Sequence, residues 1–386
     1  MNFTRRTLLA SALATPALAQ FTKMKLGLLT TLSGPAADGA GPGSVLAARM
    51  AISDVLGDTG VELLVADMGT SPDQGAAIAR AWYDQGVHAV LDVPNSATGL
   101  AVADLARARN RLALFSGAGS AALVAGCASN HLQWTYNTTA LARAGAGAVL
   151  AEGGRSWFFL TVDYSFGHAL QRDVTTVVKA DGGRVLGAAK FPGDTQEFSA
   201  LLLQAQASGA DVIGLACTGE PFQALVKQAR EFGIKPRLAA LLCLTTNIHA
   251  IGLEDAQGLL VTEPFYWDLT DASRAFSARF APQNRGIHPT MVHAGVYAAT
   301  RHLLRAAPGH DPADGAGLLA AMQALPVDDA LFGRSTLRGD GSVAHQMHLF
   351  RVKTPAASRE DWDFYERIRT MEDAFAPSAA CGKEPG

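Results

Sequence analysis

Two loops of this sequence carry hydrogen-bond donors that could hold an anion. Asn95 and Ser96 follow one apolar run, and Ala118, Gly119 and Ser120 follow the next. Serine hydroxyls and asparagine amides donate hydrogen bonds, and the N–H groups at a helix N-terminus add donors and a favourable dipole. Glycine and alanine let a ligand approach the backbone closely. The pattern predicts a carboxylate site, although each serine could equally be only a helix N-cap, and both roles are compatible.

Such loops recur because strand and helix patterns alternate along the chain. Short apolar runs predict strands, and Gly, Pro, Ser and Asn residues follow each run. We expect strands at 26–30, 61–66, 88–93, 112–115, 157–162, 185–189, 212–216, 238–242 and 259–262. A long loop at 33–43 should lead into a helix capped by Ser44. The alternation predicts an α/β protein of two Rossmann-like lobes, each with a parallel central sheet.

The last third of the chain departs from this alternation. Helical periodicity predicts helices at 272–280, 293–305 and 317–325, with a helix also expected earlier at 140–150. A hairpin is expected around Gly339-Asp340-Gly341. The small, polar tail at 377–386 should be mobile.

The N-terminus has the features of an export signal. Arg5 and Arg6 precede an apolar run that ends in a small-x-small sequence at 17–19. Residues 1–19 are therefore predicted to be a twin-arginine-like signal peptide, with the general secretory route as the alternative. The mature protein should start near Gln20 and be periplasmic. This argues against a cytoplasmic regulator on the same fold.

Composition and cysteine spacing exclude several classes of partner and cofactor. A net charge of −3 gives no reason to expect nucleic acid or an anionic membrane as partner. The four cysteines, Cys127, Cys217, Cys243 and Cys381, form no CxxC pair, so one disulfide is compatible with export but its pairing stays open. The histidines lack metal-ligand spacing, and we expect neither a metal nor another cofactor.

An exported enzyme is the competing interpretation. No GxSxG nucleophile elbow occurs, and the glycines at 39–43 do not form GxGxxG, since Pro42 also removes an N–H group. Asp163, Ser165 and His168 are close in sequence and could suggest a catalytic triad. However, Asp163 and Ser165 precede the predicted helix and His168 lies inside it, which argues against a triad. We therefore expect a binding protein without catalytic residues.

Seven short motifs in order resemble the periplasmic leucine/isoleucine/valine-binding family of ABC-transporter receptors. They are LSGP at 32–35, NSAT at 95–98, FSGAGS at 115–120, DYSFG at 163–167, DTQEF at 194–198, QAREFG at 228–233 and GLLVT at 258–262. The resemblance spans roughly residues 25–370 and implies two lobes joined by three crossovers near 134–137, 261–264 and 340–345. Lobe 1 would comprise 25–135 plus 263–340, and lobe 2 would comprise 136–262 plus 341–376. It also implies a monomer that delivers a small molecule to an inner-membrane permease.

The resemblance also implies where the ligand binds. The carboxylate would lie against Asn95, Ser96 and the loop at 118–120, with Phe166 and Thr218 contributed by lobe 2. Tyr164 and Phe166, with Tyr266 and Trp267, would line the cleft for an apolar body. Thr245 is also expected to contact the ligand.

One position departs from the family pattern. Amino-acid receptors of this family hold the ligand ammonium with an acid that follows the strand ending here at Leu242, where this chain has Cys243, Leu244 and Thr245. An unpaired ammonium in a closed cleft is costly, so the sequence predicts a carboxylate without an ammonium group. Its motifs GPGSVLAARMA at 41–51, WTY at 134–136 and FYWD at 265–268 are similar to the subgroup associated with aromatic acids. Asp38 and Glu220 are the alternatives for a replacement acid.

Overall fold

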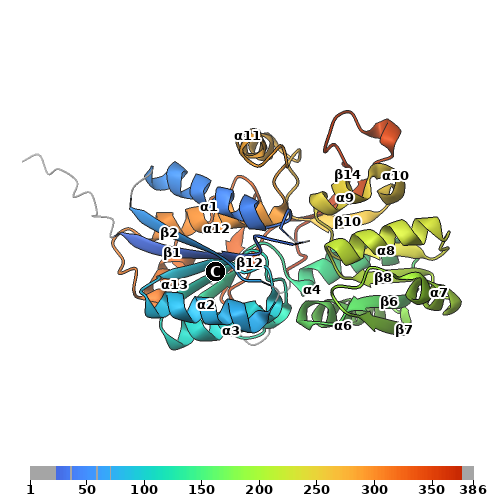
Figure 1. The fold of residues 1–386 in the computed structure, drawn as a ribbon, viewed down its shortest axis with the longest axis horizontal. Coiled ribbons are helices and arrows are strands. Elements are labelled where there is room, and N and C mark those ends of the chain that lie inside the picture. The colour runs from blue at the N-terminus through green and yellow to red at the C-terminus, as the bar shows by residue number, and fades with distance from the viewer. Residues whose placement is uncertain (1–22, 35–36, 58–59, 70, 376–386) are drawn as a thin grey trace, which may run out of the picture.

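The chain folds into two lobes that lie side by side, lobe 1 on the left of Figure 1 and lobe 2 on the right. The computed structural model describes residues 23–34, 37–57, 60–69 and 71–375. The predicted signal peptide at 1–19 and the predicted mobile tail at 377–386 lie outside these residues. Each lobe contains a parallel central sheet, which confirms the predicted α/β class with two Rossmann-like lobes.

Lobe 1 is built on a five-stranded parallel sheet in the order β2-β1-β3-β4-β5. Its strands are β1 (Met24–Thr30), β2 (Val61–Asp67), β3 (Ala89–Asp92), β4 (Leu112–Phe115) and β5 (His131–Gln133). Successive strand side chains point to opposite faces. Leu26 and Leu28 therefore pack with α1 (Gly41–Leu56) and α12 (Met291–Ala306), whereas Leu29 packs on the other face with α2 (Pro72–Asp84) and α3 (Ser96–Ala108).

Lobe 2 repeats this plan with a four-stranded parallel sheet in the order β7-β6-β8-β9. The strands are β6 (Ser156–Val162), β7 (Arg184–Phe191), β8 (Val212–Ala216) and β9 (Arg237–Ala240). One face packs against α6 (Ser165–Ala180), and the other against α7 (Ser199–Ala207) and α8 (Glu220–Glu231). Two short helices, α9 (Thr245–Ile251) and α10 (Leu253–Ala256), follow β9.

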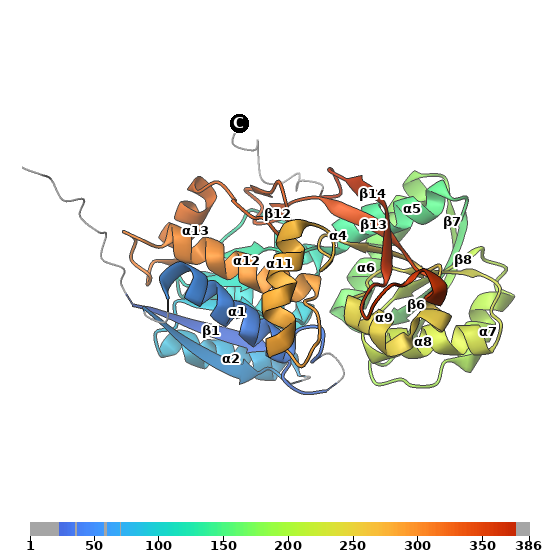
Figure 2. The same ribbon diagram turned by 90° about the horizontal axis from the view of Figure 1, so that it is seen from above.

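The remaining elements connect or cover the two sheets, as Figure 2 shows from above. A third, antiparallel sheet has the order β10-β13-β14, and β11 pairs with β12 in the region of the predicted hairpin. These strands are β10 (Leu260–Glu263), β11 (Thr336–Leu337), β12 (Val343–Ala344), β13 (Met347–Val352) and β14 (Tyr365–Met371). The remaining helices are α4 (Thr138–Leu141), α5 (Gly147–Ala151), α11 (Asp271–Phe280) and α13 (Gly315–Ala324).

One local prediction was wrong, and another was right about the helix but missed an irregular turn inside it. Ser44 does not cap the first helix, because α1 already begins at Gly41, whose N–H donates to Thr30 Oγ1 at 3.1 Å, and Pro42 fits the first turn. Ser44 is instead buried inside the helix. The single helix expected at 140–150 is divided into α4, a π-helical turn (Ala142–Ala146) and α5.

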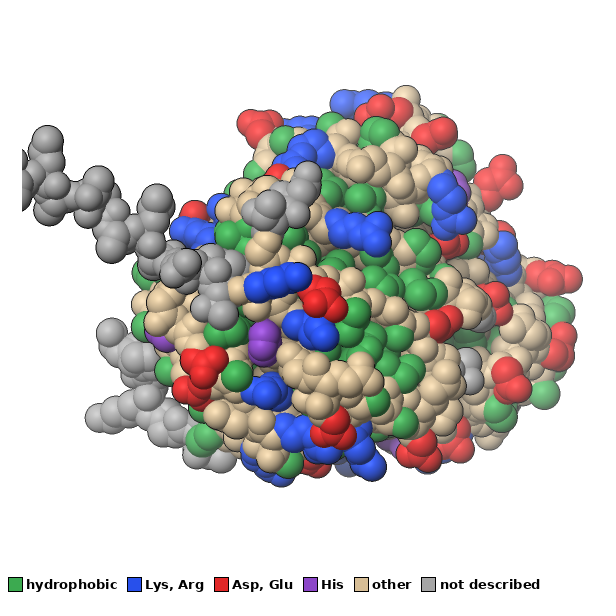
Figure 3. All heavy atoms as spheres, turned by 60° about the vertical axis from the view of Figure 1, so that its left-hand side comes forward, with side chains coloured by type: hydrophobic (Ala, Val, Ile, Leu, Met, Phe, Trp, Pro, Cys, Tyr) green, Lys and Arg blue, Asp and Glu red, His purple; other side chains and the backbone are tan. Residues whose placement is uncertain are grey.

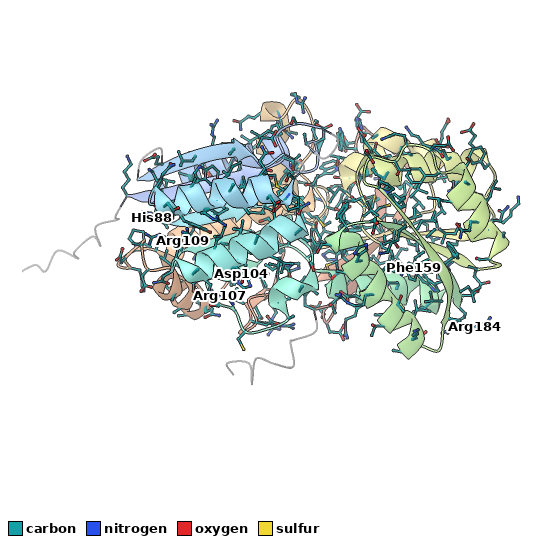
Figure 4. All side chains as sticks on the ribbon, turned by 60° about the horizontal axis from the view of Figure 1, so that its bottom comes forward. His88, Asp104, Arg107, Arg109, Phe159 and Arg184 are labelled. Carbon is teal, nitrogen blue, oxygen red and sulfur yellow. The ribbon has the colours of Figure 1, made fainter. Side chains whose placement is uncertain are left out.

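Charged side chains are paired and dispersed over the surface. Figure 3 shows basic and acidic groups interspersed on the face of lobe 1 that it presents. The labelled Arg107 and Arg109 in Figure 4 lie in lobe 1 and bond to Asp104 at 2.7 Å and Asp84 at 2.8 Å. In the described part of the chain, none of the helices combines the length and apolarity that a membrane span requires.

Candidate functional site

The loops after β3 and β4 are joined through the two predicted serines. Ser96 Oγ accepts the N–H of Ser120 at 3.0 Å, and Ser120 Oγ accepts the N–H of Ala122 at 3.3 Å. Asn95 caps α3, because its Oδ1 accepts the N–H of Thr98 at 3.0 Å. Each serine hydroxyl uses an acceptor lone pair in these bonds and keeps its proton to donate. The structural and ligand-binding roles of the serines are therefore compatible.

The carbonyl groups of the loop at 117–120 are all engaged. Gln133 Nε2 donates to the carbonyls of Ala118 at 2.8 Å and Ser120 at 3.1 Å. The carbonyl of Gly117 accepts from Tyr136 Oη at 3.0 Å, and that of Gly119 accepts from the backbone N–H of residue 138 at 2.8 Å.

The two N–H groups at the centre of this loop remain available. Those of Ala118 and Gly119 donate to no other residue within the described ranges. A buried backbone donor requires an acceptor, and a ligand carboxylate supplies one. The loop is thus arranged as a set of donors, consistent with an anion site.

The two lobes meet at Gly119. A methyl group there would lie 2.5 Å from Tyr136 Cε2 and 3.1 Å from Phe166 Cε2. Phe166 lies in the first turn of α6 and is buried. Tyr164, one residue before α6, is 38% exposed. Glycine is required at 119 because the aromatic rings occupy the space of any side chain.

A cavity of about 330 Å³ lies between the first loop of lobe 1 and the starts of α8 and α9 in lobe 2. Its lining includes the predicted Thr218 and both alternative acids, Asp38 and Glu220. Asp38 pairs with Arg285 at 2.9 Å, and Glu220 Oε2 accepts from Gln196 at 3.4 Å. The acids therefore face an interlobe space, although Asp38 already has a basic partner.

The structure places a buried acid beside the position where the family's acid is missing. Glu263 of β10 is fully buried, and its Oε1 accepts the phenol proton of Tyr365 at 2.8 Å. Burial raises the pKa of Glu263 to about 8, although the bond from Tyr365 opposes this shift. Burial and the nearby Glu263 also raise the pKa of Cys243. Sequence reasoning missed Glu263 because nothing local distinguishes it from an exposed strand-end acid.

Three of the predicted site residues lie in packed surroundings. Thr245 is the first residue of α9 and is 1% exposed. The indole N–H of Trp267 donates to the Trp362 carbonyl at 2.9 Å, and Tyr266 donates to the same carbonyl at 2.7 Å. These bonds hold Tyr266 and Trp267 in a hydrophobic cluster that also contains residues of β6 and α8.

The remaining candidates for chemistry are surface pairs or buried thiols. His168 Nε2 lies 2.7 Å from Asp163 Oδ1, which Lys190 also approaches at 3.4 Å, so this is an exposed ion-pair group. Cys217 and Cys243 are buried free thiols, whereas Cys381 lies outside the described residues.

A second cavity of about 300 Å³ lies within lobe 1, lined by Trp134 and by residues of α11 and α12. Two of its basic residues, Arg301 and Arg305, share Asp328, at 3.9 and 3.2 Å. These charges are satisfied within the protein.

Comparison with known proteins places the chain in a family. The profile of the periplasmic binding proteins matches residues 23–359. A periplasmic binding protein from Burkholderia mallei is 36% identical, with a TM-score of 0.89 over 93% of this chain and 98% of that chain. A branched chain amino acid ABC transporter periplasmic ligand-binding protein from Burkholderia xenovorans LB400 is 35% identical, with a TM-score of 0.80 over 92% and 97% of the two chains.

A more distant structure shares the fold alone. It is a solute binding protein of an ABC transporter from R. palustris in complex with benzoate, 18% identical, with a TM-score of 0.79 over 90% of this chain and 96% of that one. Comparison with curated protein sequences gives no match. The family match agrees with the resemblance carried by the seven motifs. The chain belongs to the periplasmic binding protein family, whose members are extracytoplasmic solute-binding receptors.

Proposed function

We propose that this protein is the receptor of an ABC importer and binds a small carboxylate with an apolar or aromatic body between its lobes. The observation that carries the proposal is the loop at 117–120, where the N–H groups of Ala118 and Gly119 have no acceptor among the described residues. Phe166 lies against the same loop and supplies an apolar wall. The proposal includes a monomeric receptor with the lobe boundaries given above and an inner-membrane permease as partner.

The relatives support a carboxylate but leave two ligand classes. The R. palustris protein holds benzoate, whereas the relative from Burkholderia xenovorans is a branched chain amino acid transport protein. Both classes carry a carboxylate, and they differ in the ammonium group. The acid expected after Leu242 is replaced by Cys243 and Leu244, which favours the acids without ammonium. The alternative, an amino acid, is supported by Asp38 and Glu220 at the interlobe cavity.

The ligand class is the first prediction. We expect aromatic carboxylates such as benzoate and phenylacetate to bind at least tenfold more tightly than leucine, isoleucine or valine. Tenfold corresponds to about 1.4 kcal/mol, which is modest beside the ~1–3 kcal/mol cost of an unsatisfied buried polar group. Calorimetric titration measures these affinities, and mass spectrometry of molecules released on denaturation identifies the natural ligand. Tightest binding of leucine would assign the site to amino acids.

A second prediction concerns Ser120. Replacing it with alanine removes a hydroxyl proton from the carboxylate site, and we expect binding to weaken by about 1–2 kcal/mol. Ser335→Ala is the control, because Ser335 is half-buried far from this loop in the sequence and its hydroxyl bonds only to the Gly333 carbonyl among described residues, at 3.1 Å. If the two variants bind with equal affinity, Ser120 acts only as a helix cap and does not contact the ligand.

Export is the subject of a third prediction. Replacing both Arg5 and Arg6 with lysine should prevent periplasmic accumulation, because the twin-arginine route requires the arginine pair. Fractionation of cells that express the two forms measures this. Normal export of the double variant would assign the protein to the general secretory route.

A further inference from the structure

Thr138 makes three hydrogen bonds at the junction of the two lobes. It is the first residue of α4, directly after the predicted first crossover, and it is fully buried. Its backbone N–H donates to the Gly119 carbonyl at 2.8 Å. Its Oγ1 accepts the N–H of Ala121 at 3.0 Å. Two of the three bonds therefore hold the donor loop of lobe 1.

The third bond joins Thr138 to the helix α6 of lobe 2. The Thr138 hydroxyl donates its proton to Asp173 Oδ2 at 2.6 Å. Asp173 lies in the middle of α6, the helix whose first turn carries Phe166. A hydrogen bond to a carboxylate is stronger than one between neutral groups. Since a hydroxyl both accepts and donates, Thr138 connects the loop and the helix through a single oxygen.

The same two elements meet a second time at the site itself. The Phe166 ring lies against Gly119, and that glycine's carbonyl is the one held by Thr138. Two contacts therefore fix the distance between the free N–H groups of the loop and the Phe166 ring of α6: the packing of Phe166 against Gly119 and the hydrogen bonds of Thr138. One contact is apolar and lies at the proposed carboxylate site, and the other is polar.

We infer that Thr138 and Asp173 are positioning residues for ligand binding: their hydrogen bond sets how the donor loop of lobe 1 faces Phe166 of lobe 2. The inference rests on the proposed function for the role of the loop as the carboxylate site. Neither residue need touch the ligand. Thr138→Val removes both functions of the hydroxyl at nearly constant volume, whereas Thr138→Ser keeps them.

The experiment compares these variants with a threonine of the same helix. Thr176 is exposed, and its hydroxyl bonds to the Arg172 carbonyl within α6 at 3.1 Å, so Thr176→Val controls for the loss of a threonine hydroxyl. Affinities for benzoate and for leucine are measured by calorimetry. Amide exchange of Ser120 is measured by NMR in the ligand-free protein, because its N–H bonds to Ser96 and not to Thr138.

We expect Thr138→Val to bind the tighter of the two probes about tenfold more weakly and to exchange the Ser120 amide faster. Thr138→Ser and Thr176→Val should match the wild type within about twofold. Asp173→Ala tests the same bond from the partly exposed side of α6 and should reproduce the loss if Thr138→Val fails to fold. Unchanged affinity and unchanged Ser120 exchange in Thr138→Val, or in Asp173→Ala, would overturn the inference. If the wild type binds neither probe, the proposed ligand class fails, while the exchange measurement still decides the positioning role.

Discussion

Replacing Gly119 with alanine is expected to weaken ligand binding by about 2 kcal/mol, or roughly thirtyfold, the middle of the range for overpacking a close contact. The added methyl group would lie 2.5 Å from Tyr136 Cε2, closer than atoms pack, and 3.1 Å from Phe166 Cε2, which is tighter than most carbon contacts. Because Phe166 belongs to lobe 2, the clash with its ring disfavours the arrangement in which the two lobes close on the ligand. Calorimetric titration with the tightest-binding carboxylate measures the loss.

Gly126→Ala is the matched control for this variant. A methyl group at Gly126 would meet no heavy atom within 4 Å among the described residues, and its backbone is not left-handed. We expect this control to bind as the wild type does. Full affinity of Gly119→Ala would mean that the bound lobes do not close on this glycine.

Replacing Glu263 with glutamine is expected to stabilise the ligand-free protein at pH 8 by about 4 kcal/mol, because the folded state then no longer buries a carboxyl group that the unfolded chain would ionise freely. The pKa of Glu263 is raised to about 8 from an ordinary value of 4.5, mainly by burial. The folded protein therefore binds this proton more tightly than the unfolded chain does. The resulting stability is fully present below about pH 4.5 and is lost as the pH rises towards 8.

Denaturant titrations at pH 5, 7 and 8 measure this dependence as the difference between variant and wild type. Glutamine keeps an acceptor for the Tyr365 phenol, so the variant preserves the bond seen at Oε1. Glu366→Gln, an exposed position on β14, should follow the wild type at each pH. A variant advantage that does not grow between pH 5 and 8 would contradict the raised pKa of Glu263.

The parallel strands could be predicted because their apolar runs are continuous. The strand expected at 212–216 coincides with β8, whose five residues are all buried. Such strands are covered on both faces and therefore read as unbroken hydrophobic segments. β5 was missed because His131 and Gln133 are polar. Their burial is tolerated because both side chains bond to backbone carbonyls of neighbouring segments. β14 was missed because most of its residues are exposed, so its sequence lacks a hydrophobic face.

The site was accessible to sequence reasoning only where it depends on local chemistry. Ser96 and Ser120 follow predicted strands, and the structure joins them by a hydrogen bond. Gln133, Tyr136 and Thr138 hold the same loop, but they come from a stretch without periodicity. Their role depends on the pairing of β4 with β5, which is a property of the tertiary structure. Ligand binding by the predicted residues is a prediction that the calorimetric titrations test.

The packing of α1 against α12 has a consequence for the order of events during synthesis. These helices cover one face of the lobe 1 sheet together, although the chain between them includes all of the lobe 2 sheet. The face of β1 and β3 therefore stays partly uncovered until residue 306 has left the ribosome. Contacts so distant in sequence also slow folding, since the loop between them must close first. Lobe 1 is thus completed only after the lobe 2 sheet has been synthesised, and a chaperone meets a nascent chain whose first sheet still exposes apolar surface.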